Sequence, residues 1–242
     1  MRALTASEII QLWETAYRFH PIDQTLSVLR VVMPDHSRDE LAALPLGQRD
    51  LLLLALRKIT FGDTLPGKSH CPHCSETVEF ELSCSALEQD FAEPRQKTVS
   101  QDGYTFEVRP LNSFDLAAAA DETTLQRARD LLLQRCSFNV HYQGKSIDFD
   151  KLPKEIEKTI SKTALAVDPQ AEKLLNLNCP SCRNHWHGML EIGHILWLEI
   201  TARAQRLLME VHLLAKTYGW AEVEILKLSP ARRAAYLQMV AT

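Results

Sequence analysis

The sequence lacks any apolar run long enough to cross a membrane, and it has few glycines and no low-complexity tract. Its longest apolar run is LLLLAL, residues 51–56, whereas a membrane-spanning helix needs roughly 18 apolar residues. Among its 242 residues, eight are glycine and 11 are proline. We therefore expect no membrane partner and little disorder, and a chain of this length can bury a core in one or two domains.

Two further absences bear on compartment and chemistry. The opening MRALTASEII has neither the apolar core nor the small-residue cleavage site of a signal peptide, so we expect a cytoplasmic protein. The sequence also contains no P-loop, no G-x-S-x-G, no H-E-x-x-H and no G-x-G-x-x-G. Because no such motif is present and no pair of carboxylates is marked by its spacing, we expect a protein that is not an enzyme.

A strong excess of charge of one sign is also missing. The formal net charge is −4, and the acidic excess lies in residues 71–178, which carry 12 positive and 18 negative side chains. Residues 192–242 carry six positive and four negative side chains. A nucleic-acid-binding protein usually concentrates basic side chains on one surface, so we expect no nucleic-acid partner.

The stretch YGWAEVEILKLSPARRAAYL, residues 218–237, nevertheless has the pattern of a helix-turn-helix, in which Arg232 and Arg233 would face phosphates. Two arginines are few against the roughly 6–10 phosphate contacts of a typical DNA-binding protein. We therefore favour a packed helical hairpin, with a core formed by Trp220, Ile225, Leu228 and Tyr236.

Four of the six cysteines stand in two copies of one motif, CPHC at 71–74 and CPSC at 179–182. A two-residue spacer lets both thiolates of a knuckle reach one ion, and zinc binds four thiolates in a tetrahedron. Each copy is flanked by residues that alternate as in short strands, for example Val78, Phe80 and Leu82. The pattern predicts a zinc ribbon that holds one structural Zn²⁺ per chain, with Cys71, Cys74, Cys179 and Cys182 as ligands.

A redox-active C-x-x-C pair is the alternative. Thioredoxin-like motifs precede a helix, whose N-terminus lowers the pKa of a thiol, whereas strands follow both motifs in this sequence. We interpret the histidines near the knuckles, His70, His73, His185 and His187, as exposed residues or hydrogen-bonding partners of the ligands rather than ligands. The two remaining cysteines, Cys84 and Cys136, are expected to be half-buried thiols.

The elements predict an α+β fold, in which helical N- and C-terminal regions surround the four-cysteine zinc ribbon and a mixed α/β subdomain is inserted into it. Helix signals include Ser7 as an N-cap, Pro21 in a first turn, a Ser37–Glu40 capping box and a stop at Gly62. Hairpin turns are expected at 102–103 and 143–144. The predicted regions are 1–66 (helical), 67–84 plus 172–191 (ribbon), 85–171 (insert) and 192–242 (long helix and hairpin).

The long helix, predicted over roughly 192–217, carries a near-heptad apolar seam. The seam consists of Leu196, Ile200, Ala204, Leu207, Val211, Leu214 and Tyr218. Two interpretations remain open: the seam belongs to the core of the protein, or part of it binds a partner.

Several stretches together resemble the T-even-type bacteriophage baseplate hub and hub-assembly chaperone family, which has relatives in operons for contractile injection systems. They are LAALPLGQRDLLLLALRKITFG, CPHCSETVEFEL, VRPLNSFDLAAAA, DPQAEKLLNLNCPSCRNHW and AKTYGWAEVEILKLSPARRAAYLQMV, in this order along nearly the whole chain. The family's phage members do not all carry paired C-x-x-C knuckles.

The resemblance implies a non-enzymatic protein that binds hub, spike or wedge proteins of a contractile tail while the baseplate is assembled in the bacterial cytosol. It leaves open whether the protein stays in the particle. The last of these stretches resembles a segment shared among baseplate assembly proteins, so we expect the partner surface in the C-terminal region, roughly residues 192–242, with Arg232 and Arg233 exposed. The candidate partner-binding residues are Trp220, Arg232, Arg233 and Tyr236. A zinc-ribbon regulator that binds nucleic acid and a C-x-x-C redox protein remain the alternatives.

Overall fold

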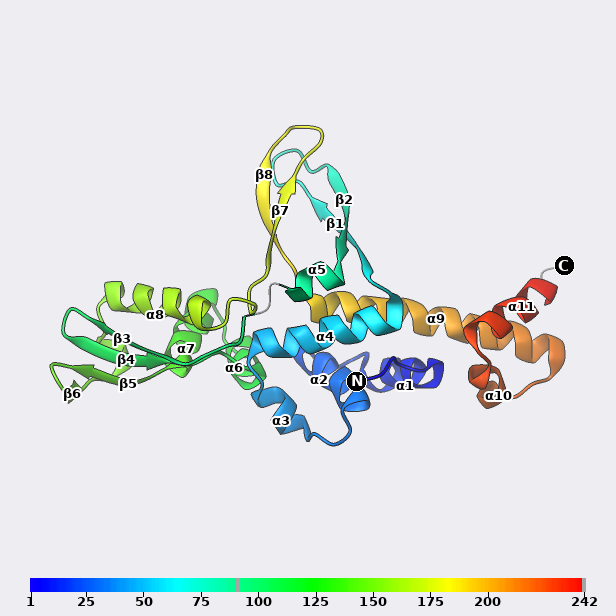
Figure 1. Cartoon of the computed structure of the whole chain (residues 1–242), viewed down its shortest axis with the longest axis horizontal. Coiled ribbons are helices and arrows are strands. Elements are labelled where there is room, and N and C mark those ends of the chain that lie inside the picture. Colours follow the sequence, from blue (N-terminus) through cyan, green and yellow to red (C-terminus); the bar gives the residue numbers. More distant parts are fainter. Residues whose placement is uncertain (90–91, 241–242) are drawn as a thin grey trace. The chain divides into compact units, whose positions relative to one another are not determined.

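The computed structural model describes residues 1–89 and 92–240 and divides the chain into two compact units. Unit 1 consists of Met1–Asp35 and Gly193–Thr242, and unit 2 of His36–Ile192. The predicted α+β fold class is confirmed, with the helices and strands labelled in Figure 1. The division into four regions stays a prediction; residues 90–91 of its insert and 241–242 of its last region lie outside the described residues.

Unit 1 is helical. Its elements are α1 (Ala6–Ala16), α2 (Pro21–Val32), α9 (Ile192–Tyr218, whose first residue belongs to unit 2), α10 (Glu222–Lys227) and α11 (Pro230–Val240). Pro21 occupies the first turn of α2 as expected. The predicted N-cap of α1 was wrong: Thr5, not Ser7, is the cap. Thr5 has extended backbone, its hydroxyl accepts from the Glu8 N–H, and the Glu8 carboxylate accepts from the Thr5 N–H.

The near-heptad seam of α9 is mainly core. Its five buried members are Leu196, Ile200, Ala204, Leu207 and Leu214. Val211 is half-buried and Tyr218 is exposed. The seam is therefore buried within this chain except at its C-terminal end.

Unit 2 begins with α3 (Arg38–Ala43) and α4 (Leu46–Phe61). The predicted Ser37–Glu40 capping box starts α3, and α4 ends at Gly62, whose φ of 102° is accessible to glycine at little cost. The N-cap of α4 is Pro45, which offers no side-chain acceptor. Its first turn is instead bound by Asp168, whose Oδ2 accepts from the Gly47 N–H at 2.9 Å.

Two separate antiparallel ribbons form the next part of unit 2. The first pairs β1 (Thr64–His70) with β2 (Thr77–Ser83) and continues into the short helix α5 (Cys84–Gln89). The second pairs β7 (Leu174–Asn178) with β8 (His185–Met189). Each ribbon is a strand, a knuckle and a strand, as the alternating pattern predicted.

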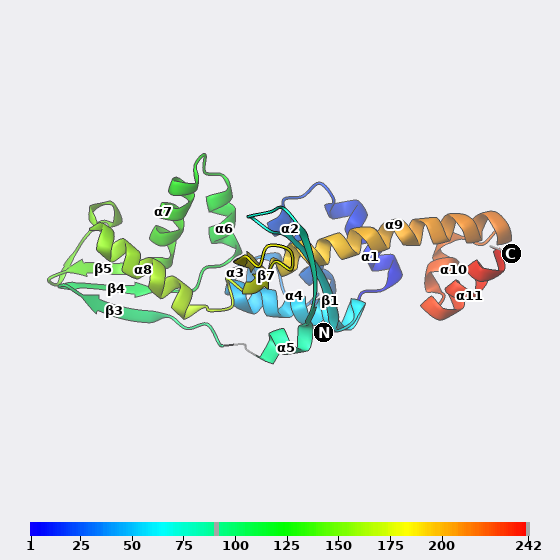
Figure 2. The same ribbon diagram turned by 90° about the horizontal axis from the view of Figure 1, so that it is seen from above.

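The segment between the ribbons builds a four-stranded sheet with helices (Figure 2). Its strands are β3 (Lys97–Gln101), β4 (Tyr104–Val108), β5 (Ser137–Tyr142) and β6 (Lys145–Ser146), in that order. Its helices are α6 (Ser113–Ala120), α7 (Leu125–Cys136), the 3-10 turn η1 (Phe149–Lys151) and α8 (Lys154–Val167). Both predicted hairpin turns are present, and Gly103 and Gly144 adopt positive φ there. The fully buried members of the core around α7 and α8 include Phe106, Val108, Cys136, Ile156 and Ile160.

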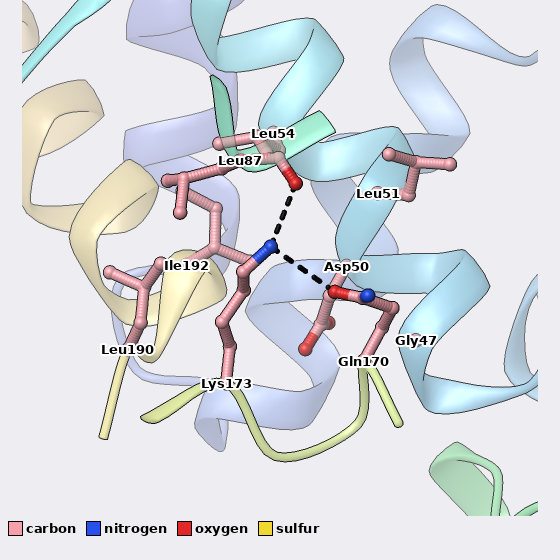
Figure 3. Close-up of a pocket in the computed structure, with 9 residues that line it drawn as sticks. All are labelled: Gly47, Asp50, Leu51, Leu54, Leu87, Gln170, Lys173, Leu190 and Ile192. Atoms are coloured by element: carbon pink, nitrogen blue, oxygen red, sulfur yellow. Dashed lines mark hydrogen bonds between the residues drawn. The ribbon is translucent and has the colours of Figure 1, made fainter. Parts of the chain in front are cut away.

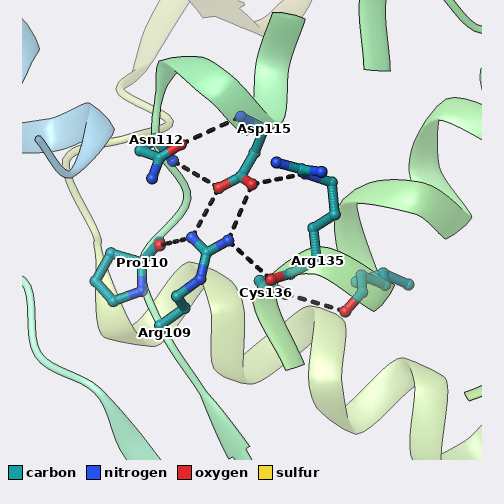
Figure 4. Close-up of polar contacts among 7 residues, drawn as sticks. Arg109, Pro110, Asn112, Asp115, Arg135 and Cys136 are labelled. Carbon is teal, nitrogen blue, oxygen red and sulfur yellow. Dashed lines mark hydrogen bonds and ion pairs between the residues drawn. The ribbon is translucent and has the colours of Figure 1, made fainter. Parts of the chain in front are cut away.

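A buried carboxylate fastens α6 to the sheet (Figure 4). Asp115 is fully buried, and Arg109 binds it with both terminal nitrogens at 2.7 and 2.9 Å. Arg135, at the end of α7, adds a third bond at 2.8 Å. Asp115 also closes a capping box with Asn112 at the start of α6. The carboxylate thus joins β4, α6 and α7.

Candidate metal centre

The two cysteine knuckles have the same backbone structure, which the sequence repeat alone did not specify. In the first, the Ser75 N–H donates to the Cys71 carbonyl and the Cys71 N–H to the Glu76 carbonyl, both at 2.9 Å. In the second, Arg183 and Asn184 make the same two bonds with Cys179, also at 2.9 Å. Each knuckle is therefore a rigid six-residue turn that closes its ribbon.

One residue in each knuckle adopts a left-handed backbone conformation. Ser75 has φ of 59° and Arg183 has φ of 60°, in each case directly after the second cysteine. Non-glycine residues adopt this conformation uncommonly. Because this residue has the same position in both knuckles, the two turns share one backbone conformation. Neither serine nor arginine is typical of this conformation, so the role of these two residues could not be predicted from the sequence.

The structure brings all four predicted cysteines together, with their Sγ atoms within 4.8 Å of one another. Two short sulfur distances join the knuckles: Cys71 to Cys182 at 3.6 Å and Cys74 to Cys179 at 3.5 Å. All four are free thiols, and a disulfide bond would place its sulfurs about 2.05 Å apart. A tetrahedral ion with bonds of about 2.3 Å to sulfur would place the sulfurs about 3.8 Å apart. The cluster could therefore hold a metal ion with little rearrangement.

The thiols differ in acidity. Burial raises the pKa of Cys71, but hydrogen bonds from the backbone N–H groups of Cys74 and His73 and from the Cys182 thiol lower this pKa to about 6. The Glu76 N–H lowers the pKa of Cys74, but its thiol neighbours and burial raise it to about 12. Ionisation of Cys71 is therefore favoured while that of Cys74 is disfavoured. A bound cation would allow the remaining thiols to ionise as well.

The ribbons carry apolar side chains on the faces that are shielded from solvent. Leu65 and Leu177 are buried, and Phe80 and Trp186 are half-buried. Two glycines make this packing possible. A Cβ on Gly67 would lie 2.2 Å from the Phe80 ring, and one on Gly188 would lie 3.0 Å from Leu177. These two close approaches could not be predicted from the sequence, because each depends on a residue of the facing strand.

The four histidines near the knuckles are exposed, as predicted, and none belongs to the cysteine cluster. His185 and His187 lie on the exposed face of β8. Cys84 and Cys136 differ from their prediction, because both are fully buried rather than half-buried. Cys84 accepts from Arg57 and Cys136 donates to the Leu133 carbonyl, and burial raises the pKa of each thiol. They therefore belong to the core.

A small cavity of about 30 Å³ lies where the second ribbon meets α4 and α5 (Figure 3). Lys173 enters it, and its Nζ donates to the Leu87 carbonyl at 2.7 Å and to Gln170 Oε1 at 3.2 Å. The apolar part of the lining consists of Leu51, Leu54, Leu87, Leu190 and Ile192. The cavity has room for water rather than for a substrate. Lys173 directly precedes β7, and its bond to Leu87 therefore links the start of that strand to α5.

The residues predicted as a partner surface lie close together in unit 1. The rings of Tyr218, Trp220 and Tyr236 form a triad with centroids 4.8 to 5.7 Å apart. Arg232 is exposed, and its guanidinium carbon lies 5.9 Å from the Tyr236 ring centre. We call these four residues the aromatic platform. Trp220 and Tyr236 are half-buried and Tyr218 is 36% exposed, so the rings are both packed and accessible.

The predicted exposure of Arg233 was wrong. This side chain is 2% exposed, and its Nε binds Glu210 at 2.5 Å while Nη1 donates to the Leu228 carbonyl. Arg203 binds the same carboxylate at 3.0 Å. Arg233 thus fastens α11 and the end of α10 to α9. The burial of Arg233 could not be predicted from the sequence, because its partner Glu210 lies 23 residues away on α9.

Together these features define a protein with two antiparallel ribbons whose knuckles meet in a four-cysteine cluster that could hold a metal ion. The chain belongs to the family described as T4 bacteriophage base plate protein, whose profile matches residues 20–196. The predicted family is therefore confirmed. The match includes all four cysteines and ends before the aromatic platform. No curated protein and no solved structure matches the chain.

Membership of this family implies a structural role in a phage baseplate and association with other baseplate components. Within residues 1–89 and 92–240, no helix combines the length and the apolar character that a membrane span requires.

Proposed function

We propose that the protein acts without catalysis in assembling the central hub of a contractile tail, of a phage or of a tail-like injection particle, by binding hub, spike or wedge proteins. The family match over residues 20–196 carries this proposal. That range contains all of unit 2, with its ribbons and inserted sheet, and part of unit 1. Assembly of such particles takes place in the bacterial cytosol, where free thiols persist.

In this role, one structural zinc ion per chain is held by Cys71, Cys74, Cys179 and Cys182. Four thiolates complete the tetrahedron and leave no position for water or substrate, so the ion has no catalytic step to perform. Binding joins two ribbons whose knuckles are more than 100 residues apart, as the 105-residue separation of Cys74 and Cys179 shows. Closing such a loop costs about 4 kcal/mol, against roughly 10–16 kcal/mol available from structural zinc.

The aromatic platform is the surface through which this protein is proposed to bind a hub component. Aromatic and arginine side chains dominate the binding energy of many protein interfaces, particularly where the rings are fixed before binding. Here the buried Arg233–Glu210 pair fixes α11 against α9, and Gly219 turns the chain with φ of 70°. The platform is therefore ordered in the free protein.

No structural observation favours the two alternative functions. Each C-x-x-C motif lies between two strands, and neither stands at the N-terminus of a helix as in thioredoxin-like redox proteins. The helical hairpin at residues 222–240 exposes Arg232 but uses Arg233 in an internal ion pair. A helix-turn-helix would thus lose one of its two candidate phosphate contacts.

The test is co-expression of the protein with the hub, spike and wedge proteins of its own tail, followed by co-purification. Wild-type protein should retain a hub component, and Arg232→Glu should retain much less, because reversing an interface charge weakens association. Arg95→Glu is the matched control, since Arg95 is also highly exposed but lies in unit 2. Absence of any baseplate component from the wild-type sample would refute the assembly role. Equal retention by Arg232→Glu would instead remove the platform from the interface.

A further inference from the structure

Helix α9 has a second apolar face, opposite its buried seam. Its exposed apolar side chains are Leu198 (54% exposed), Met209 (64%) and Leu213 (39%), and the exposed Ala202 lies between them. At 100° per residue these four positions fall within about 60° of one another on the helix. We call them the outer stripe. It covers residues 198–213, or about 22 Å of helix, all within unit 1.

The shape of the outer stripe fits another helix. Steps of four, seven and four residues keep apolar side chains in a nearly straight line along a helix, as in helix pairs that pack at small crossing angles. The backbone groups in the middle of α9 are bonded within the helix, so a partner strand would find no donors or acceptors there. Side-chain packing along a straight line is then the available mode of contact.

Charges beside the outer stripe decide what kind of helix fits. Arg206 and Lys216 are exposed, and Arg206 forms no ion pair within the part of the chain that the structure describes. His212 is exposed on the other border of the stripe, about 120° around the helix from Arg206. The nearest acid on this face, Glu199, is half-buried and has a partner inside the chain. Arg206 thus flanks one border and Lys216 follows the stripe at its C-terminal end, so the exposed full charges next to the stripe are basic.

A second copy of this chain fits poorly. In an antiparallel pair centred on residues 198–213, Arg206 would approach its own counterpart at the symmetry axis. In a parallel pair, Lys216, which lies in line with the stripe, would face its own counterpart, and Arg206 would lie beside Gln205 of the second copy rather than beside an acid. Like charges that face each other across an interface are unfavourable, whereas acidic side chains at those positions would pair with Arg206 and Lys216.

We propose that the outer stripe of α9 binds an amphipathic helix of another protein, with an apolar face of small and branched side chains and acidic residues along its borders. This surface is distinct from the aromatic platform in its residues and in its chemistry. Only the claim that the natural helix belongs to a baseplate protein rests on the proposed assembly role. Binding of an amphipathic helix with acidic borders can be tested without any baseplate protein.

The first test uses two synthetic helical peptides of about 20 residues, long enough to cover the stripe. Both carry the same face of Leu and Ala, one with Glu and the other with Lys along its borders. Fluorescence anisotropy with the full-length, metal-loaded chain should show binding of the Glu peptide that weakens as salt is added, and binding of the Lys peptide at least about tenfold weaker. Equal binding of both peptides, or of neither, would overturn the proposal.

Variants separate the apolar and the charged contributions. Met209→Gln/Leu213→Gln removes apolar contact while keeping side chains that suit a helix, and should lower affinity for the Glu peptide by about tenfold. Arg206→Glu/Lys216→Glu should reverse the preference between the peptides. The control is Leu125→Gln, because Leu125 is 92% exposed in unit 2 and should not affect binding. Circular dichroism should show unchanged folding of all three, since the changed side chains are exposed.

The second test locates the natural partner. A photo-crosslinking residue at position 213, in protein co-expressed with its tail components, should join to a helical segment of another protein with acidic borders. A crosslink to a second copy, to this chain itself or to a basic segment would overturn the proposal. If the Glu peptide binds but the crosslinked acidic helix belongs to a protein outside the baseplate, the assembly role is contradicted and the binding chemistry of the stripe is not. If a baseplate component co-purifies but the Glu peptide does not bind, the proposal for the stripe is contradicted and the assembly role is not.

Discussion

Asp168 binds the backbone N–H of Gly47 through Oδ2 at 2.9 Å, across 121 residues of sequence. The bond caps the first turn of α4, where Pro45 provides no side-chain acceptor. It also ties the end of the inserted subdomain to the helix that precedes the first ribbon. Asp168 is buried, and burial raises the pKa of its carboxyl group. Asp168 therefore links two parts of unit 2, the segment after α8 and the N-terminus of α4.

We predict that Gly47→Ala destabilises the protein. An alanine Cβ would lie 2.1 Å from Asp168 Oδ1 and 2.8 Å from the Gln170 Cβ, closer than any real contact. In an ordinary helix the same change stabilises by up to about 1 kcal/mol, so the sign itself is diagnostic. We expect a loss of about 2 kcal/mol in the free energy of unfolding, measured by urea denaturation.

The matched control is a double-mutant cycle with Asp168→Ala. Removing the carboxylate takes away the closest clash, so the double mutant should lose less than the sum of the single losses. Additive losses would mean that the two residues do not interact as described.

Metal content is the second prediction. Protein purified without chelator should contain about one zinc ion per chain, and Cys71→Ser or Cys179→Ser should lose it and melt at a lower temperature, because metal affinity contributes to folding stability. Protons compete with the ion for thiolates, so zinc should dissociate as the pH falls. Elemental analysis and calorimetry measure these effects.

Cys84→Ala and Cys136→Ala serve as controls, since both thiols lie outside the four-cysteine cluster. Each should keep the zinc stoichiometry even if burial makes the change destabilising. Metal-free wild-type protein with reversible disulfide formation would support the redox alternative instead.

The sequence predicted those features that depend on neighbours in the chain. The capping box at Ser37 and Glu40, the stop at Gly62 and the two hairpin turns all rest on contacts within a few residues. The cysteine knuckles were predictable because their spacing alone carries the geometry of the ligand set. Thr5 and Ser7 show the limit of such signals, since two capping residues close together compete and the later Glu8 decides.

Features that depend on distant residues were not predictable. Arg233 is polar and lies in a segment that looks exposed, and only the position of Glu210 on α9 makes its burial favourable. The joint of Gly47 with Asp168 gives no local signal either. The seam of α9 was visible as a pattern, but folding was needed to show that it is covered while the outer stripe is not.

The third prediction concerns Asp115→Asn and its dependence on pH. Burial raises the pKa of Asp115, but Arg109, the Asn112 N–H and Arg135 outweigh burial and hold the pKa below its ordinary value. Replacing the carboxylate leaves both arginines without their anion, so we expect a loss of about 3 kcal/mol at neutral pH. Chemical denaturation at several pH values measures it.

The sign of the pH effect follows from the lowered pKa. A carboxyl group with a depressed folded-state pKa contributes stability above its ordinary pKa and loses it as the pH falls through the folded-state value. The difference between wild type and Asp115→Asn should therefore shrink below about pH 4. A constant difference down to pH 2.5 would show that the network in Figure 4 acts by shape rather than by charge.

The last prediction separates the two neighbouring arginines of α11. Arg233→Ala leaves the Glu210 carboxylate with only Arg203 and removes a donor from the Leu228 carbonyl, so α10 and α11 should detach from α9. Arg232→Ala removes an exposed side chain and should change stability by less than about 0.5 kcal/mol. Hydrogen exchange of residues 222–240 should accelerate strongly in the first variant and stay unchanged in the second.

Because Arg232→Ala keeps the hairpin folded, any loss of partner binding in that variant reports on the interface itself. Equal exchange in both variants would mean that the Arg233–Glu210 pair does not hold the hairpin, and the platform would then need another anchor.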